Sequence, residues 1–160
     1  MWERWNGDQM LADPSMNSYN HYAYGAVADW IYTYGAGVDA TTADAGYHTT
    51  YLHPTFDARL GSLDFSYDSR YGQIHSSWSV KGPTAAWNLK IPPNTTAELP
   101  LTASQQTAFS LDGVPIASSK HVHATGETDG RTTYLLPAGT YSFSVAVTAP
   151  ANDSAGQSMN

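Results

Sequence analysis

The spacing of apolar residues changes once along this chain, from a helical period to a period of two. Between Ser18 and Tyr34, apolar and aromatic residues recur every three or four positions, which places them on one side of a helix. From about Gly46 onward they alternate with polar residues, as they do in half-buried strands. The chain is therefore predicted to begin with one amphipathic helix and to continue as a mainly β domain.

The predicted helix has recognisable ends and an unusual surface. Asn17 or Ser18 can cap its first turn, and Gly35 and Gly37 are residues at which helices commonly stop. The stripe along it is aromatic and wide, and consists of Tyr19, Tyr22, Ala23, Ala26, Val27, Trp30, Ile31 and Tyr34. Such a stripe is broader than one small domain needs, so we expect it to pack against other helices.

Short strands are predicted at intervals of about ten residues, with turn signals between them. They are Tyr47–Leu52, Leu60–Tyr67, Gly72–Val80, Ala85–Ile91, Thr95–Pro100, Thr107–Leu111, Thr132–Leu136 and Tyr141–Val147. Asp112-Gly113 is the clearest hairpin signal, because this turn needs positive φ and is flanked by apolar residues. The expected fold class is mainly β, an antiparallel β-sandwich of about eight strands.

Four aromatic residues of the predicted sandwich divide into two groups. Trp78 and Trp87 fall within alternating strands and are expected in the core. Tyr67 and Tyr71 flank a turn and are expected at the surface, where a tyrosine ring can contact a sugar.

Length, charge and cysteine content exclude several classes of protein. A chain of 160 residues suits one domain or one domain with a short attachment. The net charge is −7 and the seven basic residues are scattered, whereas nucleic-acid binding needs clustered Lys and Arg. No apolar run approaches the ~20 residues that span a bilayer, so no membrane partner is expected. Without cysteines no disulfide framework exists, and the low charge content slightly favours a secreted or periplasmic protein over a cytoplasmic one.

The first two dozen residues contain the groups that a sugar site needs. Glu3 lies between Trp2 and Trp5, and His21 follows at the start of the predicted helix. Aromatic faces bind sugar rings, and carboxylates break glycosidic bonds. Simpler interpretations are an exposed Glu3 paired with Arg4, tryptophans that pack under the helix, and a histidine satisfied by a helix cap or water.

The histidines offer a weaker signal for a metal. His121 and His123 fall on one face of an extended stretch, a spacing that some zinc sites use. They lack a third or fourth ligand nearby in the sequence, so no metal site and no cofactor are expected. His48, His53 and His75 are expected to be ordinary surface or groove residues.

Six ordered segments carry a resemblance to a known family. They are Trp2–Gly7, Met16–Val27, Gly46-Tyr47 with Pro54, Tyr67–Gly72, Ile91–Ala97 and Ala138–Phe143. Their order and spacing over about 140 residues resemble the bacterial α-L-rhamnosidases of glycoside hydrolase family 78. Tyr19 and Arg70 depart from the family's commoner Phe and Pro, and neither touches the chemistry that the resemblance implies.

This resemblance implies an α/α barrel followed by a C-terminal β-sandwich, and inverting hydrolysis of terminal α-L-rhamnosyl residues. Glu3 matches the general base, while Trp2, Trp5 and His21 match positions that contact substrate. The family's general acid lies earlier in the barrel, in a part that these 160 residues do not contain. We therefore expect the chain by itself to be inactive.

The expected organisation follows from the same resemblance. Residues 1–40 are interpreted as the end of an (α/α)6 barrel, residues 41–149 as the sandwich, and residues 150–160 as a disordered tail.

Two other functions remain open from the sequence. One is a non-catalytic carbohydrate-binding or accessory module, and the other is a structural protein that self-assembles through the aromatic helix between Tyr19 and Tyr34. The expected partners are accordingly a rhamnose-containing glycoside, the remaining part of a barrel, or a second copy of the chain.

Overall fold

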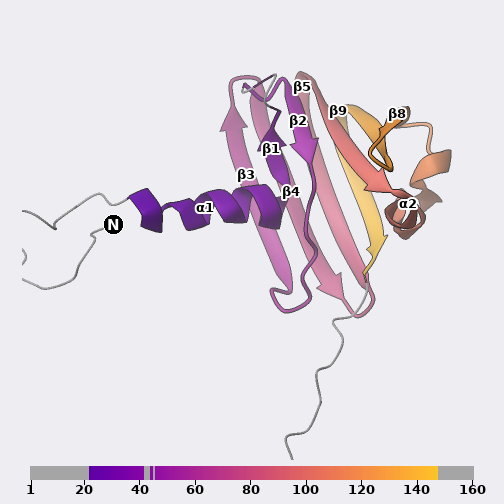
Figure 1. The fold of residues 1–160 in the computed structure, drawn as a ribbon, viewed down its shortest axis with the longest axis horizontal. Coiled ribbons are helices and arrows are strands. Elements are labelled where there is room, and N and C mark those ends of the chain that lie inside the picture. Colours follow the sequence, from indigo (N-terminus) through magenta and orange to yellow (C-terminus); the bar gives the residue numbers. More distant parts are fainter. Residues whose placement is uncertain (1–21, 42–43, 45, 148–160) are drawn as a thin grey trace, which may run out of the picture.

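A computed structural model describes residues 22–41, 44 and 46–147, and shows one helical segment attached to a β domain (Figure 1). The helical elements are η3 (Tyr22–Tyr24), α1 (Ala26–Trp30), η4 (Ile31–Ala36), α2 (Ala103–Ala108) and η5 (Ile116–Ser118). The strands are β1 (Val38–Ala40), β2 (Thr49–Leu52), β3 (Ser62–Ser69), β4 (Gly72–Lys81), β5 (Thr84–Thr102), β6 (Phe109–Leu111), β7 (Val114–Pro115), β8 (His123–Thr128) and β9 (Arg131–Ala146). The predicted mainly β fold, preceded by one helical segment, is confirmed.

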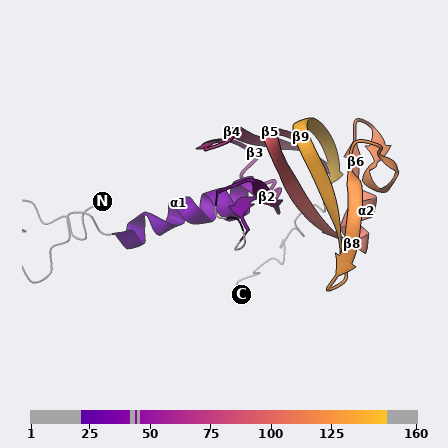
Figure 2. The ribbon, with the colours of Figure 1, turned by 90° about the horizontal axis from the view of Figure 1, so that it is seen from above.

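Two long strands, β5 and β9, hold the β domain together. They pair antiparallel along most of their length, with a shift of register between Ile91 and Thr96. Before the shift β5 also pairs with β4, which pairs with β3. After the shift β5 pairs in parallel with β2, which pairs with β1. The sheet thus bends into two layers, and β5 and β9 belong to both, as corner strands of sandwiches do (Figure 2).

The length of these strands differs from the sequence prediction. Pro92-Pro93-Asn94 falls between the predicted strands Ala85–Ile91 and Thr95–Pro100, but β5 continues through it. Asn94 has a φ of 60°, and the register shifts at this point because the extra residues form a bulge that bends the strand between layers. The predicted strands Thr132–Leu136 and Tyr141–Val147 are likewise joined in one strand, β9, which runs from Arg131 to Ala146.

One predicted turn is present in the structure, and one helix stands where a strand was predicted. Asp112 and Gly113 have φ angles of 50° and 78° between β6 and β7, as the hairpin signal predicted. The helix α2 lies where the strand Thr107–Leu111 was expected to begin, and β6 starts only at Phe109. Thr102 and Gln105 start this helix with reciprocal capping bonds.

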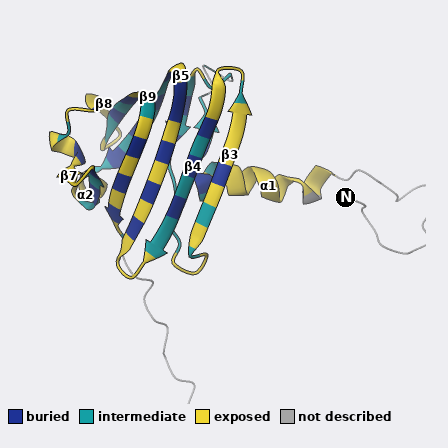
Figure 3. Cartoon of the chain, turned by 180° about the vertical axis from the view of Figure 1, so that it is seen from behind, coloured by how far each residue is buried: buried dark blue, intermediate teal, exposed yellow. Residues whose placement is uncertain are grey.

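The core lies on the inward-facing side chains of the long strands and is rich in aromatic rings. Trp87 is fully buried and stacks on Phe143 with 4.8 Å between ring centroids. Trp78 is also buried, and Phe56 packs edge-on against both tryptophans. The expected core position of both tryptophans is confirmed. Figure 3 shows the sheet from behind, where buried residues alternate with more exposed ones along β4, β5 and β9.

The helical segment Tyr22–Ala36 projects from the sandwich and meets it only at its C-terminal end (Figures 1 and 2). It ends at Gly37, whose φ of 65° lies in the left-handed region. This is the helix end that the glycines predicted. Within the described part of the chain, no helix is long and apolar enough to cross a membrane.

Candidate functional site

The predicted site residues Glu3, Trp2, Trp5 and His21 lie outside the described residues. The helical segment that follows His21 in the sequence is described from Tyr22 onward. The structure therefore describes the helical segment that follows these residues in the sequence and the surfaces beside that segment.

The first of these surfaces is the aromatic side of the helix. Trp30 and Tyr34 are stacked with their ring centroids 6.2 Å apart, and more than half of each side chain is exposed. Val27 and Ile31 are exposed as well. The predicted stripe is present, and within the described residues it is uncovered along most of its length.

A groove continues this stripe onto the β domain. Trp30, Ile31 and Tyr34 form one wall, and Leu60 and Leu63 contribute to the other. The groove encloses about 630 Å³ and its lining is mainly apolar. A groove of this size and character suits another apolar side-chain surface more than a flat polar ligand.

One carboxylate lies at the edge of this groove, and Arg59 occupies both of its oxygens. Arg59 Nη2 donates to Asp57 Oδ2 at 2.6 Å, and Arg59 Nε donates to Oδ1 at 3.1 Å. These hydrogen bonds lower the pKa of the Asp57 carboxyl to about 2. Asp57 is therefore ionised at neutral pH and cannot serve as a general acid.

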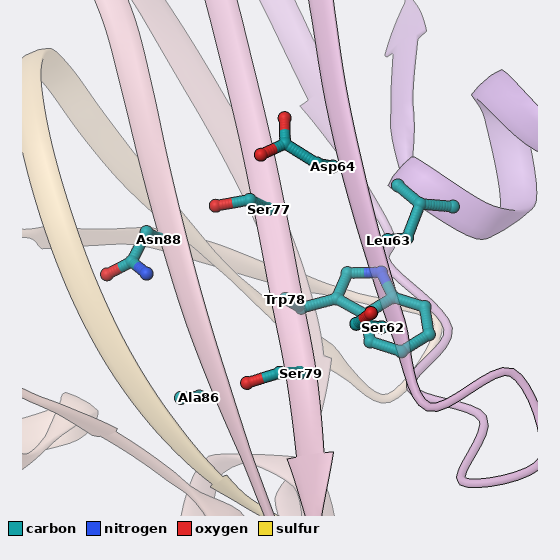
Figure 4. Close-up of a pocket in the computed structure, with 8 residues that line it drawn as sticks. All are labelled: Ser62, Leu63, Asp64, Ser77, Trp78, Ser79, Ala86 and Asn88. Atoms are coloured by element: carbon teal, nitrogen blue, oxygen red, sulfur yellow. The ribbon is translucent and has the colours of Figure 1, made fainter.

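A polar hollow of about 300 Å³ lies on the outer face of β3, β4 and β5. Asp64, Ser77 and Asn88 project from adjacent strands into it, whereas Leu63 and Trp78 point to the other face, toward the helix (Figure 4). Among the side chains that line this hollow, Asp64 supplies the only carboxylate. The hollow offers hydrogen bonds to a polar ligand but lacks the carboxylate pair that glycoside hydrolysis uses.

The expected surface tyrosines gather at one end of the sandwich. Tyr67 and Tyr71 are 38% and 42% exposed, as predicted. The ring of Tyr47 lies 4.7 Å from that of Tyr67, and the ring of His48 lies 5.2 Å from that of Tyr71. Because both tyrosines are in contact with neighbouring rings, they form a packed cluster rather than two free platforms.

Three of the described histidines, His48, His53 and His75, each lie beside a single carboxylate. His75 Nε2 lies 3.0 Å from Asp64 Oδ1, and His53 Nε2 lies 3.9 Å from Asp39 Oδ2. In the described part of the chain, no three His, Cys, Asp or Glu side chains come together as a metal site would require.

Ser76, which joins the sandwich to the helix, was not among the residues predicted from the sequence. Ser76 is fully buried on the inward face of β4, and its Oγ donates to the carbonyl oxygen of Ala36 at 2.9 Å. A polar residue between Ile74 and Trp78 on an otherwise apolar face was the available signal.

Two family models match successive parts of the chain. Residues 1–34 match the bacterial alpha-L-rhamnosidase six-hairpin glycosidase domain, and residues 37–113 match the bacterial alpha-L-rhamnosidase C-terminal domain. The two matches meet at the end of η4, where the helix passes into the sandwich.

Curated relatives and solved structures agree with these matches. An alpha-L-rhamnosidase of Formosa agariphila is 32% identical over 146 residues, which are 89% of this chain and 16% of the relative. One of Streptomyces avermitilis is 31% identical over 91% of this chain and 13% of the relative.

Solved structures repeat the pattern. The crystal structure of the Streptomyces avermitilis alpha-L-rhamnosidase complexed with L-rhamnose matches 91% of this chain and 13% of its own, with 29% identity and a TM-score of 0.66. The Dictyoglomus enzyme structure, at 21% identity and a TM-score of 0.65, supports the fold alone. The chain thus spans about a sixth or less of the length of the relatives that it matches.

Proposed function

Because the chain belongs to the bacterial α-L-rhamnosidases and corresponds to their C-terminal region, we propose that it supplies one part of a rhamnosidase active site together with the domain that supports it. The complete enzyme removes terminal α-L-rhamnosyl residues from glycosides with inversion. The observation that carries this proposal is the junction of the two matches at residues 34–37, where the helix ends on the sandwich.

Glu3 is the proposed general base. An inverting enzyme needs a base that activates water on one side of the sugar and an acid that protonates the leaving oxygen on the other, at a separation of roughly 6.5–9.5 Å. Trp2, Trp5 and His21 are proposed to contact the sugar beside Glu3. This assignment is supported by their match to the family motif and by the match of residues 1–34 to the glycosidase domain.

The 160 residues alone are proposed to be inactive, because neither Asp57 at the groove nor Asp64 at the polar hollow offers a replacement for the general acid. A general acid needs surroundings that keep it protonated near neutral pH. Asp57 is held ionised by Arg59, and Asp64 has a side chain that is 78% exposed, without an apolar enclosure.

The exposed aromatic side of the helix and the groove beside it are proposed to pack against other helices of the barrel. The exposed fractions of Trp30 and Tyr34 and the apolar lining of the groove support this proposal. A patch of this kind seldom remains in contact with water in a stable protein.

The same exposed surface favours a second candidate, self-association of the chain through its helix. Measurement of the oligomeric state by sedimentation distinguishes self-association from packing against a barrel. A monomer at all concentrations would exclude self-association, whereas a dimer that Trp30→Ser dissociates would support it.

The polar hollow on the outer face instead suits an accessory carbohydrate-binding role, and L-rhamnose titration followed by tryptophan fluorescence would test that role.

A hybrid enzyme tests the proposed function. This chain replaces the corresponding C-terminal part of the Streptomyces avermitilis relative, and turnover of p-nitrophenyl α-L-rhamnopyranoside is measured. We expect turnover from the hybrid, none from the 160 residues alone, and loss of turnover in the hybrid with Glu3→Gln. Glu127→Gln, at an exposed position on β8, is the matched control. A hybrid that folds and retains activity with Glu3→Gln would refute the assignment of the base.

A further inference from the structure

The end of the helix is held by the sandwich through its carbonyl oxygens. An isolated helix leaves its last carbonyls without partners. Here two backbone donors next to β2 bind carbonyls of the helix end: Thr55 N donates to Tyr34 O at 3.1 Å, and His53 N donates to Gly37 O at 2.9 Å. Both donors lie in the connection that follows β2, so the helix end is tied to that layer.

Two side chains of β4 bind the carbonyls in between. Trp78 Nε1 donates to Gly35 O at 2.9 Å, and Ser76 Oγ donates to Ala36 O at 2.9 Å. Ser76 Oγ also accepts a hydrogen bond from Trp87 Nε1 at 3.0 Å, which fixes the direction of the hydroxyl. Four successive carbonyls, from residue 34 to residue 37, are therefore bound by the two layers together.

The small residues at the helix end permit this close approach. A Cβ atom on Gly35 would lie 3.0 Å from Leu63 Cδ1, and one on Gly37 would overlap the backbone of Pro54. Tyr32 adds a ring contact to Phe65 of β3, with 4.9 Å between centroids. The helix end is thus enclosed on several sides, and a shift along or around its axis would break several hydrogen bonds at once.

We infer that Ser76 and Trp78 are positioning residues, which set the direction and axial position of the helix that leads into the catalytic barrel. The bonds are made inside a low-dielectric core, where a lost partner leaves a buried polar group unsatisfied. The sandwich then acts as a fixed anchor for the helix, and two side chains of β4 set the direction in which the helix leaves the sandwich. This inference rests on the proposed function only in naming the helix as part of the barrel.

A distance measurement on the full chain tests the inference. The protein has no cysteine, so Val27→Cys on α1 and Ser144→Cys on β9 can be spin-labelled selectively, and both positions are exposed. Double electron–electron resonance then gives the distribution of distances between the helix and the sheet. We expect Ser76→Ala and Trp78→Phe each to broaden or shift this distribution.

Leu136→Ala is the control, because Leu136 is fully buried in β9 and loss of its side chain weakens the core without removing a bond to the helix. An unchanged distribution in both β4 variants, or an equal broadening in Leu136→Ala, would overturn the inference. If Trp78→Phe does not fold, Ser76→Ala decides alone. The readout is helix position rather than turnover, so its failure is distinguishable from a failure of the rhamnosidase assignment.

Discussion

Gly37 and Pro54 touch through their backbones, so that a Cβ atom on Gly37 would overlap the nitrogen and Cα of Pro54. Gly37 also has a φ of 65°, a conformation that L-residues with a side chain adopt at a cost. Both the left-handed backbone and the contact with Pro54 therefore require glycine at the residue where the helix passes into the sandwich.

Gly37→Ala should destabilise the chain strongly. The left-handed conformation costs about 1–2 kcal/mol, and the overlap with Pro54 adds roughly 1–3 kcal/mol more. Gly82→Ala is the matched control, since Gly82 has a φ of 59° but open space around it. The destabilisation by each substitution is measured as the decrease in the free energy of unfolding in urea. Equal losses would mean that the backbone at Pro54 yields without cost.

Thr50→Val should stabilise the protein by up to about 1 kcal/mol. Thr50 is fully buried, and its Oγ1 has no hydrogen-bond partner among the described protein groups. Valine has nearly the same shape and removes the unsatisfied hydroxyl.

Thr95→Val provides the opposite case for comparison. Thr95 is also buried, but its Oγ1 donates to Pro92 O at 2.7 Å within the bulge of β5. Its loss should cost about 1 kcal/mol, measured as the change in urea midpoint. Destabilisation by Thr50→Val as large as that by Thr95→Val would show that the Thr50 hydroxyl is bonded in solution.

Asp57 should make stability depend on pH in the acid range. Hydrogen bonds from Arg59 lower its folded pKa to about 2, below the unfolded value of about 4. Its contribution is therefore complete above about pH 4 and is lost as the pH falls toward 2.

The corresponding measurement compares wild type and Asp57→Asn by urea unfolding between pH 7 and pH 2. We expect the variant to be less stable at neutral pH and the difference to vanish near pH 2. The difference should be small, because an exposed ion pair is screened by water. A difference that stays constant with pH would exclude the carboxylate as its source.

The parts of this fold that follow from local rules were predictable, and those that depend on neighbouring strands were not. The glycine at position 37 marks the helix end, because a left-handed C-terminal residue is a local requirement. Pro92-Pro93-Asn94 looks locally like a turn, and only pairing with both β9 and β2 makes it a bulge in one long strand.

The contacts at the helix end could not be predicted from the sequence for the same reason. Ser76 and Ala36 are 40 positions apart in the sequence, so no local pattern connects them. What the sequence did contain was a polar residue on the apolar face of β4, which implies a buried partner without saying which one. The site residues near Glu3 came from the resemblance, and they remain predictions because they lie outside the described residues.

Trp30 offers a test of whether the exposed stripe packs against a barrel. Its side chain is 59% exposed in this chain, so Trp30→Ala should change the stability of the 160 residues by only about 0.5 kcal/mol. In the hybrid enzyme, where other helices are present, the same ring is expected to be buried, and its loss should then cost roughly 3–5 kcal/mol. Leu136→Ala, in the core of the sandwich, is the control, and it should lower the stability of the 160 residues and of the hybrid enzyme equally. Equal small effects of Trp30→Ala in the two proteins would mean that the stripe faces water even when the barrel is complete.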